Sequence, residues 1–290
     1  MSRRVHALHK PPLLGYHVVN RSGGAPAPFV PTDIAGIKLW IDFSDADTLF
    51  TDAGSTKVSS DGDAIYRAND KSGNDYHYSQ TTSGNRPLYK TAIQNSLSIG
   101  RFDGADDYLI NTSYPELGSA TTIVICAIER KRPAAIDGLE VLLSDEPSGT
   151  NANQRALMLS TGNQWISTSK PIFALDTYSV VTEALYINGQ AASEAVDNIA
   201  ASTAFIGVVT ISGSLSPSVA GLAIGQAGTW SWPGKNDICE LIIYDTVLST
   251  PDRQAAEAQR EKDRLDKKLP GSRLEQVKSF KPKGLNFKNK

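Results

Sequence analysis

The chain has 290 residues, enough for one large domain or two small ones and for a substantial hydrophobic core. Charged residues make up 21% of the chain and the formal net charge is −2, which excludes a disordered acidic chain and a uniformly basic nucleic-acid binder. No run of 18 apolar residues occurs, and residues 1–30 lack the apolar segment of a secretory signal. We therefore expect neither a transmembrane helix nor a standard secretory signal.

The small net charge is the sum of segments of opposite sign. Residues 1–32 contain four Lys or Arg and no acidic residue, and residues 260–290 contain 11 Lys or Arg against four Asp or Glu. Residues 33–259 therefore hold 14 basic and 27 acidic residues, a formal charge of −13. Basic ends on an acidic body are typical of interaction tails.

Residues 1–30 are rich in Pro, Gly, Arg and His, as the pairs Pro11-Pro12 and Gly23-Gly24 illustrate. Such residues disfavour a regular helix and favour extended backbone. We predict an extended basic arm that is disordered alone and lies flat against a partner. Its candidate anchoring residues combine charge with apolar area, and they are Arg3, Arg4, Leu13, Leu14 and Tyr16.

Residues 31–250 contain short apolar, β-branched runs separated by turn residues. Eight ranges resemble strands: 37–42, 121–128, 139–143, 156–159, 182–187, 204–211, 221–224 and 239–244. Asn188-Gly189 follows one of these runs and predicts a β-hairpin, because a type I′ turn needs positive φ at both central residues. The pattern predicts an all-β, two-sheet antiparallel sandwich.

A C-terminal helix is predicted over residues 251–269, followed by a basic tail over 270–290. Ser249 and Asp252 supply a hydroxyl cap and a first-turn acid, and Pro270-Gly271 ends the helix. Its apolar face is thin, which favours a helix on the surface of the sandwich; the face consists of Ala255, Ala258, Leu265 and Leu269. In the tail, Phe280 and Phe287 are candidate anchoring residues.

The two cysteines, Cys126 and Cys239, each lie within an apolar run. Two cysteines cannot form a disulfide framework, so the favoured interpretation is two buried free thiols. A bridge between them stays open if their strands are neighbours.

Clustered carboxylates occur at two places in the sequence. Asp103, Asp106 and Asp107 surround Gly104, which predicts a tight turn whose Asp bonds to nearby backbone N–H groups. The second cluster is oxygen-rich and suits Ca²⁺, although its spacing does not match an EF-hand loop. It comprises Asp42, Asp45, Asp47 and Asp52. We therefore predict no resident cofactor or metal, with Ca²⁺ as an open alternative.

Loop aromatics are the candidates for sugar binding, because an aromatic ring can stack on the face of a sugar. They are Trp230, Trp232, Tyr114 and Trp165. Packing of Trp230 and Trp232 on the sandwich edge or on the terminal helix is the favoured alternative, and Trp40 is expected in the core. No Gly-x-Ser-x-Gly motif, Cys with a placed His or Gly-rich loop before a helix is present, so neither nucleophilic catalysis nor nucleotide binding is predicted.

Five segments in order resemble the concanavalin A-like lectin/glucanase domains of the laminin-G type. The segments are 37–49, 69–74, 85–89, 101–109 and 240–249. The resemblance spans roughly residues 37–265 and implies a two-sheet jelly roll with a concave face. Laminarinase-like members of this fold carry Glu-x-Asp-x-x-Glu on one strand, and this sequence has no such motif.

Domains of this kind occur in tailed-phage virion proteins and in bacterial surface proteins, so function must be argued from a site. Our hypothesis is a non-enzymatic structural or adhesive protein of a phage virion, such as a capsid decoration, head fibre, neck or tail protein, assembled in the host cytoplasm. Its arms would bind other virion proteins, and its sandwich would bind host-surface polysaccharide. We expect a symmetric homo-oligomer. We expect neither a nucleic-acid partner nor insertion into a membrane. The alternatives are a carbohydrate-binding lectin module at a bacterial cell surface and a glycoside hydrolase of the same fold.

Overall fold

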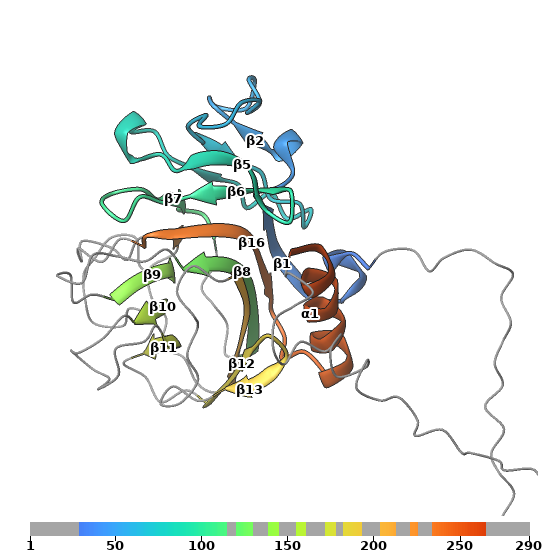
Figure 1. Cartoon of the computed structure of the whole chain (residues 1–290). Helices are drawn as coiled ribbons and strands as arrows, with labels where there is room; N and C mark the ends of the chain where they lie inside the picture. The colour runs from blue at the N-terminus through green and yellow to red at the C-terminus, as the bar shows by residue number, and fades with distance from the viewer. Residues whose placement is uncertain are drawn as a thin grey trace, which may run out of the picture.

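The computed structural model of the chain describes residues 29–114, 120–129, 139–144, 155–160, 172–177, 182–192, 204–212, 221–225 and 234–264. Within these residues the chain forms two eight-stranded antiparallel sheets and one α-helix, α1 (Thr250–Arg264). Three short 3₁₀ helices accompany them, at Pro31–Asp33, Ala46–Thr48 and Ser83–Asn85. Figure 1 shows α1 on one side of the sheet that contains β8 and β16, with strands β9 to β11 on the other side. The predicted β-sandwich with one helix is confirmed, and its assignment as a concanavalin A-like jelly roll stays a prediction.

Sheet A has the strand order β13–β12–β14–β8–β16–β6–β5, and β1 also pairs with β16. The strand β16 pairs with two strands along the same edge. Its first residues pair with β6, and its last five residues pair with β1. The strands of sheet A are β1 (Ile37–Asp42), β5 (Leu88–Gln94), β6 (Leu97–Arg101), β8 (Ala120–Glu129), β12 (Thr182–Ile187), β13 (Gln190–Ala192), β14 (Ala204–Ser212) and β16 (Asn236–Tyr244).

Sheet B has the strand order β11–β10–β9–β15–β7–β4–β3–β2. Its members at the β2 end are two or three residues long, so loops make up much of that end of the sandwich. The strands of sheet B are β2 (Leu49–Phe50), β3 (Arg67–Ala68), β4 (Tyr78–Ser79), β7 (Leu109–Asn111), β9 (Leu139–Ser144), β10 (Arg155–Ser160), β11 (Ile172–Thr177) and β15 (Leu222–Ile224).

The core between the sheets is built by alternation along the strands. In β8, Ile123 and Ile125 face the inner core, whereas Val124 and Cys126 belong to a second cluster on the outer face of sheet A. Both faces of β8 are buried, which explains why its sequence is an unbroken apolar run rather than an alternating one. The outer cluster includes Ala256 of α1, so the helix covers this face.

The hairpin predicted at Asn188-Gly189 joins β12 to β13. Both residues have positive φ, 51° and 79°, as a type I′ turn requires. The Asn188 side chain adds a long-range contact, because its Oδ1 accepts a hydrogen bond from the backbone N–H of Ile206 at 2.9 Å. The turn thereby ties the hairpin to β14.

Cys126 and Cys239 are both free and buried, which confirms the favoured interpretation of the two thiols. They lie on the neighbouring strands β8 and β16, in the outer cluster of sheet A. In this register Cys126 opposes Glu240, and a β-bulge lies between Ile238 and Glu240.

Candidate functional site

The acidic turn, defined here as residues 103–107, connects β6 of sheet A to β7 of sheet B. The carboxylate oxygens of Asp103, Asp106 and Asp107 lie within 4.8 Å of one another. Asp103 Oδ1 accepts hydrogen bonds from the N–H groups of Ala105 and Asp106, at 2.7 and 3.3 Å. Asp107 Oδ2 in turn accepts from the Asp103 N–H at 2.9 Å. The contacts are those of the predicted tight turn, with Gly104 at a φ of 80°.

Asp107 differs from the other acids of the turn in its environment. It is 4% exposed, whereas Asp103 and Asp106 are exposed to solvent. Burial, together with the charges of Asp103 and Asp106, raises the pKa of Asp107 to about 7. A protonated carboxyl beside an ionised one is an acid–base pair in chemical terms, and oxygen ligands of this kind suit hard cations. Here the Asp103 and Asp107 carboxylates also accept hydrogen bonds from backbone N–H groups of their own turn. Stabilising the turn is therefore a sufficient structural role for both residues.

The second acidic cluster does not converge on one point. Lys71 binds Asp42 and Asp45, at 3.1 and 2.8 Å from its Nζ. Asp47 pairs instead with the exposed Lys57 at 2.7 Å. The Asp52 carboxylate accepts hydrogen bonds from three consecutive backbone N–H groups of its loop, at residues 54–56, and these bonds strongly lower its pKa. The carboxylates therefore organise separate loops.

Asp70, in one of the segments that carry the family resemblance, also has a structural position. It is 8% exposed, and its carboxylate accepts hydrogen bonds from the backbone N–H groups of Trp40, Ser72 and Tyr76 at 2.9, 2.8 and 3.1 Å. These bonds fasten the loop after β3 to strand β1. Trp40 itself is half-buried against the outer cluster of sheet A.

Of the four aromatic residues predicted to bind sugar, Tyr114 falls within the described residues. Its side chain is 2% exposed and packs edge-on against Tyr76, with ring centroids 4.9 Å apart. The prediction of Tyr114 as a stacking platform is wrong, because its ring belongs to the inner core and not to a loop surface. Trp165, Trp230 and Trp232 lie outside the described residues.

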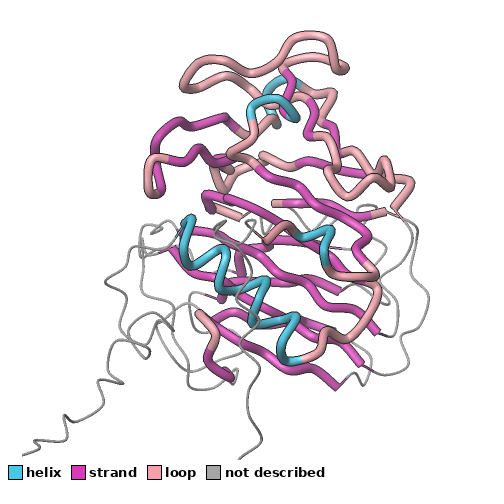
Figure 2. The backbone as a smooth tube through the Cα atoms, turned by 90° about the vertical axis from the view of Figure 1, so that its right-hand side faces the viewer, coloured by secondary structure: helices cyan, strands magenta, loops and turns pink. Residues whose placement is uncertain are grey.

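Helix α1 begins where its cap sequence predicts. The Ser249 hydroxyl accepts a hydrogen bond from the Asp252 N–H at 3.3 Å and donates one to the Asp252 carboxylate at 2.6 Å. Figure 2 looks onto the outer face of sheet A and shows α1 lying across its strands. No helix in the described part of the chain has the length and apolarity needed to cross a membrane.

The face of α1 that contacts the sheet is largely charged, which differs from the thin apolar face expected from the sequence. Its buried residues are Arg253, Ala256, Glu257, Arg260 and Glu261, whereas Ala255 and Ala258 are half-buried. The spacing of three and four residues places them on one side of the helix. This spacing is the signal that could have identified the stripe in advance.

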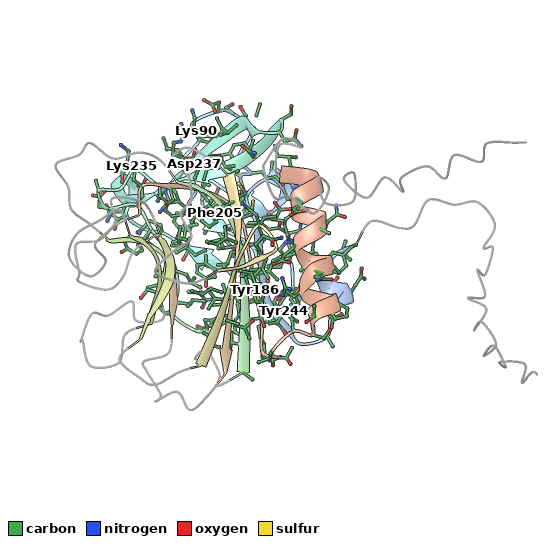
Figure 3. The ribbon with its side chains drawn as sticks, turned by 60° about the horizontal axis from the view of Figure 1, so that its bottom comes forward. Lys90, Tyr186, Phe205, Lys235, Asp237 and Tyr244 are labelled. Carbon is green, nitrogen blue, oxygen red and sulfur yellow. The ribbon has the colours of Figure 1, made fainter. Side chains whose placement is uncertain are left out.

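Two arginines of α1 hold the helix on the sheet. Arg253 binds Glu257 through both carboxylate oxygens, at 2.8 and 2.6 Å, and its guanidinium lies 3.7 Å from the centre of the Tyr186 ring. Arg260 binds Glu240 of β16 at 2.9 Å, and the Trp40 indole N–H donates to the same carboxylate oxygen at 2.7 Å. Figure 3 shows Tyr186 on the side of the sheet that faces α1.

The beginning of the described chain lies against the same helix. The Tyr244 hydroxyl donates a hydrogen bond to the carbonyl of Pro31 at 3.2 Å. Phe29 packs against the outer cluster of sheet A, and the Arg260 guanidinium lies 5.9 Å from the centre of its ring. Phe29 and α1, the two ends of the described chain, therefore lie on one face of the sandwich, which we call the α1 face. The predicted anchoring residues lie outside the described residues, and they are Arg3, Arg4, Leu13, Leu14, Tyr16, Phe280 and Phe287.

Comparison by sequence finds no match to a known protein family or to a curated protein. Comparison by structure finds distant similarity to carbohydrate-active proteins. An arabinofuranosidase, solved with arabinofuranosyl-alpha-1,2-xylobiose, is 15% identical with a TM-score of 0.48 over 68% of this chain and 50% of its own. Domain 4 of AbnA, a GH43 extracellular arabinanase from Geobacillus stearothermophilus, is 11% identical with a TM-score of 0.41 over 74% of this chain and 95% of its own.

A sialidase from Trypanosoma rangeli is also similar, with 12% identity and a TM-score of 0.36 over 80% of this chain and 34% of its own. The chain thus spans half of the arabinofuranosidase and about a third of the sialidase. Similarity at this level leaves the activity of this chain to be argued from its own residues.

Proposed function

We propose that this protein is a non-enzymatic structural or adhesive module, a concanavalin A-like jelly roll fastened to a larger assembly by its two basic ends. The assembly we favour is the virion of a tailed bacteriophage. The observation that supports the proposal is the contact between Phe29 and Arg260, at opposite ends of the sandwich sequence. Because Phe29 and the end of α1 lie on this one face, basic segments that continue from them could engage one partner surface together.

Charge gives the chemistry expected of the partner. Residues 1–28 contain four Lys or Arg and no acid, and residues 265–290 contain eight Lys or Arg and two acids, which gives +4 and +6. An acidic partner surface would attract both segments at once. Two linked contacts reinforce each other, because binding of one segment raises the effective concentration of the other.

The proposal that the module is non-enzymatic is supported by the structural use of three of its buried carboxylates. Asp237 forms a two-bond ion pair with Arg101, at 2.8 and 2.7 Å. The Glu240 carboxylate accepts hydrogen bonds from the Arg260 guanidinium and the Trp40 indole N–H, and the Asp70 carboxylate accepts them from backbone N–H groups. A glycosidase instead needs a pair of carboxyl groups that remain available to the substrate.

The anchoring proposal is tested by deleting residues 1–28 and, separately, by reversing the charge of the tail with Lys278→Glu, Lys281→Glu and Lys283→Glu. We expect each variant to fold and each to be strongly depleted from purified virions, as measured by mass spectrometry of the particles. A charge reversal on the body, Lys57→Glu, is the matched control and should be incorporated normally. Normal incorporation of a variant with both changes would contradict anchoring through the ends.

A lectin module of a bacterial surface protein is the competing function. A glycan array probed with the full chain and with Trp232→Ala separates the two: loss of glycan binding in the variant would favour the lectin. Release of reducing sugars from polysaccharides tests for hydrolysis. Hydrolysis that disappears in Asp107→Asn would overturn the non-enzymatic proposal and assign catalysis to the acidic turn.

A further inference from the structure

Strands β3, β4 and β7 of sheet B present a row of side chains on their outer face. In the sheet register Arg67 opposes Ser79, and Ser79 opposes Ile110. Residues that oppose one another in antiparallel strands project to the same face. Their neighbours Ala68, Tyr78 and Leu109 belong to the inner core, so Arg67, Ser79 and Ile110 face outward. All three are partly exposed.

The guanidinium of Arg67 is held in place by two hydrogen bonds. Its Nε donates to the Asn69 side-chain oxygen at 2.7 Å, and its Nη1 donates to the Ala53 carbonyl at 3.1 Å. A guanidinium has five N–H donors in a planar fork, so these two contacts leave three. A preorganised fork loses little entropy on binding, and its geometry matches a carboxylate.

His77 adds a second donor beside this fork. Its Nδ1 accepts a hydrogen bond from the Asp70 N–H at 3.0 Å, so in the neutral ring the proton resides on Nε2. Burial, with the nearby charge of Arg67 also contributing, lowers the pKa of His77, which keeps the ring neutral at pH 7. The side chain is 27% exposed, and its Nε2 lies 3.7 Å from the mostly exposed Asp75 carboxylate, beyond a direct hydrogen bond.

We propose that Arg67, His77, Ser79 and Ile110, which we call the sheet B patch, form a binding site for an acidic sugar that carries a single carboxylate. The carboxylate would accept hydrogen bonds from the Arg67 fork. The His77 Nε2–H and the Ser79 hydroxyl would bond to sugar oxygens, and Ile110 would contact the apolar face of the ring.

The charge of the whole body favours one carboxylate over a polyanion. Residues 33–259 carry a formal charge of −13, which repels a highly charged chain at long range. A single carboxylate bound at Arg67 incurs less of this repulsion and gains a charge-assisted pair. The patch therefore suits an acidic monosaccharide unit better than a nucleic acid or a heavily sulfated polymer.

This inference rests on the adhesive form of the proposed function and gives it a ligand. The sheet B patch is available for such a ligand because α1 covers sheet A and the patch faces the opposite way. Its test is binding by the isolated full chain, measured by calorimetry and ligand-observed NMR. The deletion experiment on virions does not affect this binding measurement. Failure of the anchoring proposal and failure of the binding-site proposal can therefore be distinguished.

The probe is D-glucuronate, with D-glucose as the matched neutral sugar and acetate as the matched carboxylate. At about 10 mM ligand, where a millimolar site is mostly occupied, we expect saturable binding of glucuronate and binding at least about tenfold weaker for glucose and acetate. Arg67→Lys keeps the charge but loses the planar fork, and should weaken glucuronate binding about tenfold. Arg86→Lys is the control, because it makes the same substitution at an arginine that is not part of the sheet B patch, and it should bind normally.

Three results would overturn the assignment. They are the absence of saturable glucuronate binding, equal binding of glucuronate and glucose, and full binding by Arg67→Lys. Acetate that binds as tightly as glucuronate would show a general carboxylate site and overturn the assignment to a sugar. If Arg67→Lys unfolds, Ser79→Ala provides the second test, with glucuronate affinity expected to fall several-fold and acetate affinity to change less.

Discussion

The buried carboxyl of Asp107 predicts a dependence of stability on pH that a single substitution should remove. The pKa of Asp107 rises from 3.8 to about 7 on folding, because burial and the two neighbouring acids disfavour its charge. Between these values the folded protein holds a proton that the unfolded chain releases. The free energy of unfolding therefore falls as pH rises through this window, and the full cost is present above pH 7.

The size of the effect follows from the shift. About three pKa units at 1.36 kcal/mol each set an upper limit of about 4 kcal/mol, and we expect roughly 2 to 4 kcal/mol. Asp107→Asn keeps the shape of the side chain and an oxygen that can accept from the Asp103 N–H. The variant should be more stable than the natural protein at pH 8 by about this amount and similar to it near pH 4.

The assay is urea unfolding followed by tryptophan fluorescence between pH 4 and pH 8, in EDTA so that no divalent cation can bind the turn. Asp75→Asn is the matched control, because the Asp75 side chain is 88% exposed and its substitution should change stability little. An Asp107→Asn protein that is equally stable or less stable than the natural one at pH 8 would refute the reasoning. So would an unchanged dependence on pH between 4 and 7.

Two further substitutions test the packing described above. Arg260→Ala should lower the free energy of unfolding by about 3 to 5 kcal/mol, because it leaves the buried Glu240 carboxylate without its cation. Adding Glu240→Gln should recover much of that loss, and urea unfolding that shows no recovery would contradict the role of the pair. Gly100→Ala places a Cβ 2.6 Å from the Phe43 ring and should cost about 1 to 3 kcal/mol or more in the same assay. Gly84→Ala meets no atom within 4 Å and should be nearly neutral, so equal costs at both sites would argue against the clash.

Much of the secondary structure could be predicted from the sequence. Each of the eight ranges expected to be strands overlaps one, among them β1, which spans Ile37–Asp42 as predicted. These strands carry long β-branched or alternating runs, which are strong local signals. The two-residue strands β2, β3 and β4 were missed, because a segment of two residues shows no periodicity and forms only when its partners are in place. In the longer β5, the positive φ of Ala92 and a register irregularity interrupt the pattern.

The candidate sites were less predictable, because each depends on residues that are far apart in the chain. The sequence left Asp42 and Asp45 open as Ca²⁺ ligands, whereas in the fold Lys71, on a later loop, binds both carboxylates. Tyr114 looked like a loop aromatic, and its burial against Tyr76 became apparent only in the fold.

The sequence by itself determined the local features: the β-rich body, the Asn188-Gly189 turn, the start of α1 and the separation of an acidic middle from basic ends. These features follow from backbone preferences and composition, which act over a few residues. The tertiary structure decided which of the distant groups meet. Strand register placed Arg67 beside Ser79, and packing of α1 on sheet A brought Arg260 to Phe29. Such contacts are set by the pairing and stacking of whole elements, which no short stretch of sequence contains.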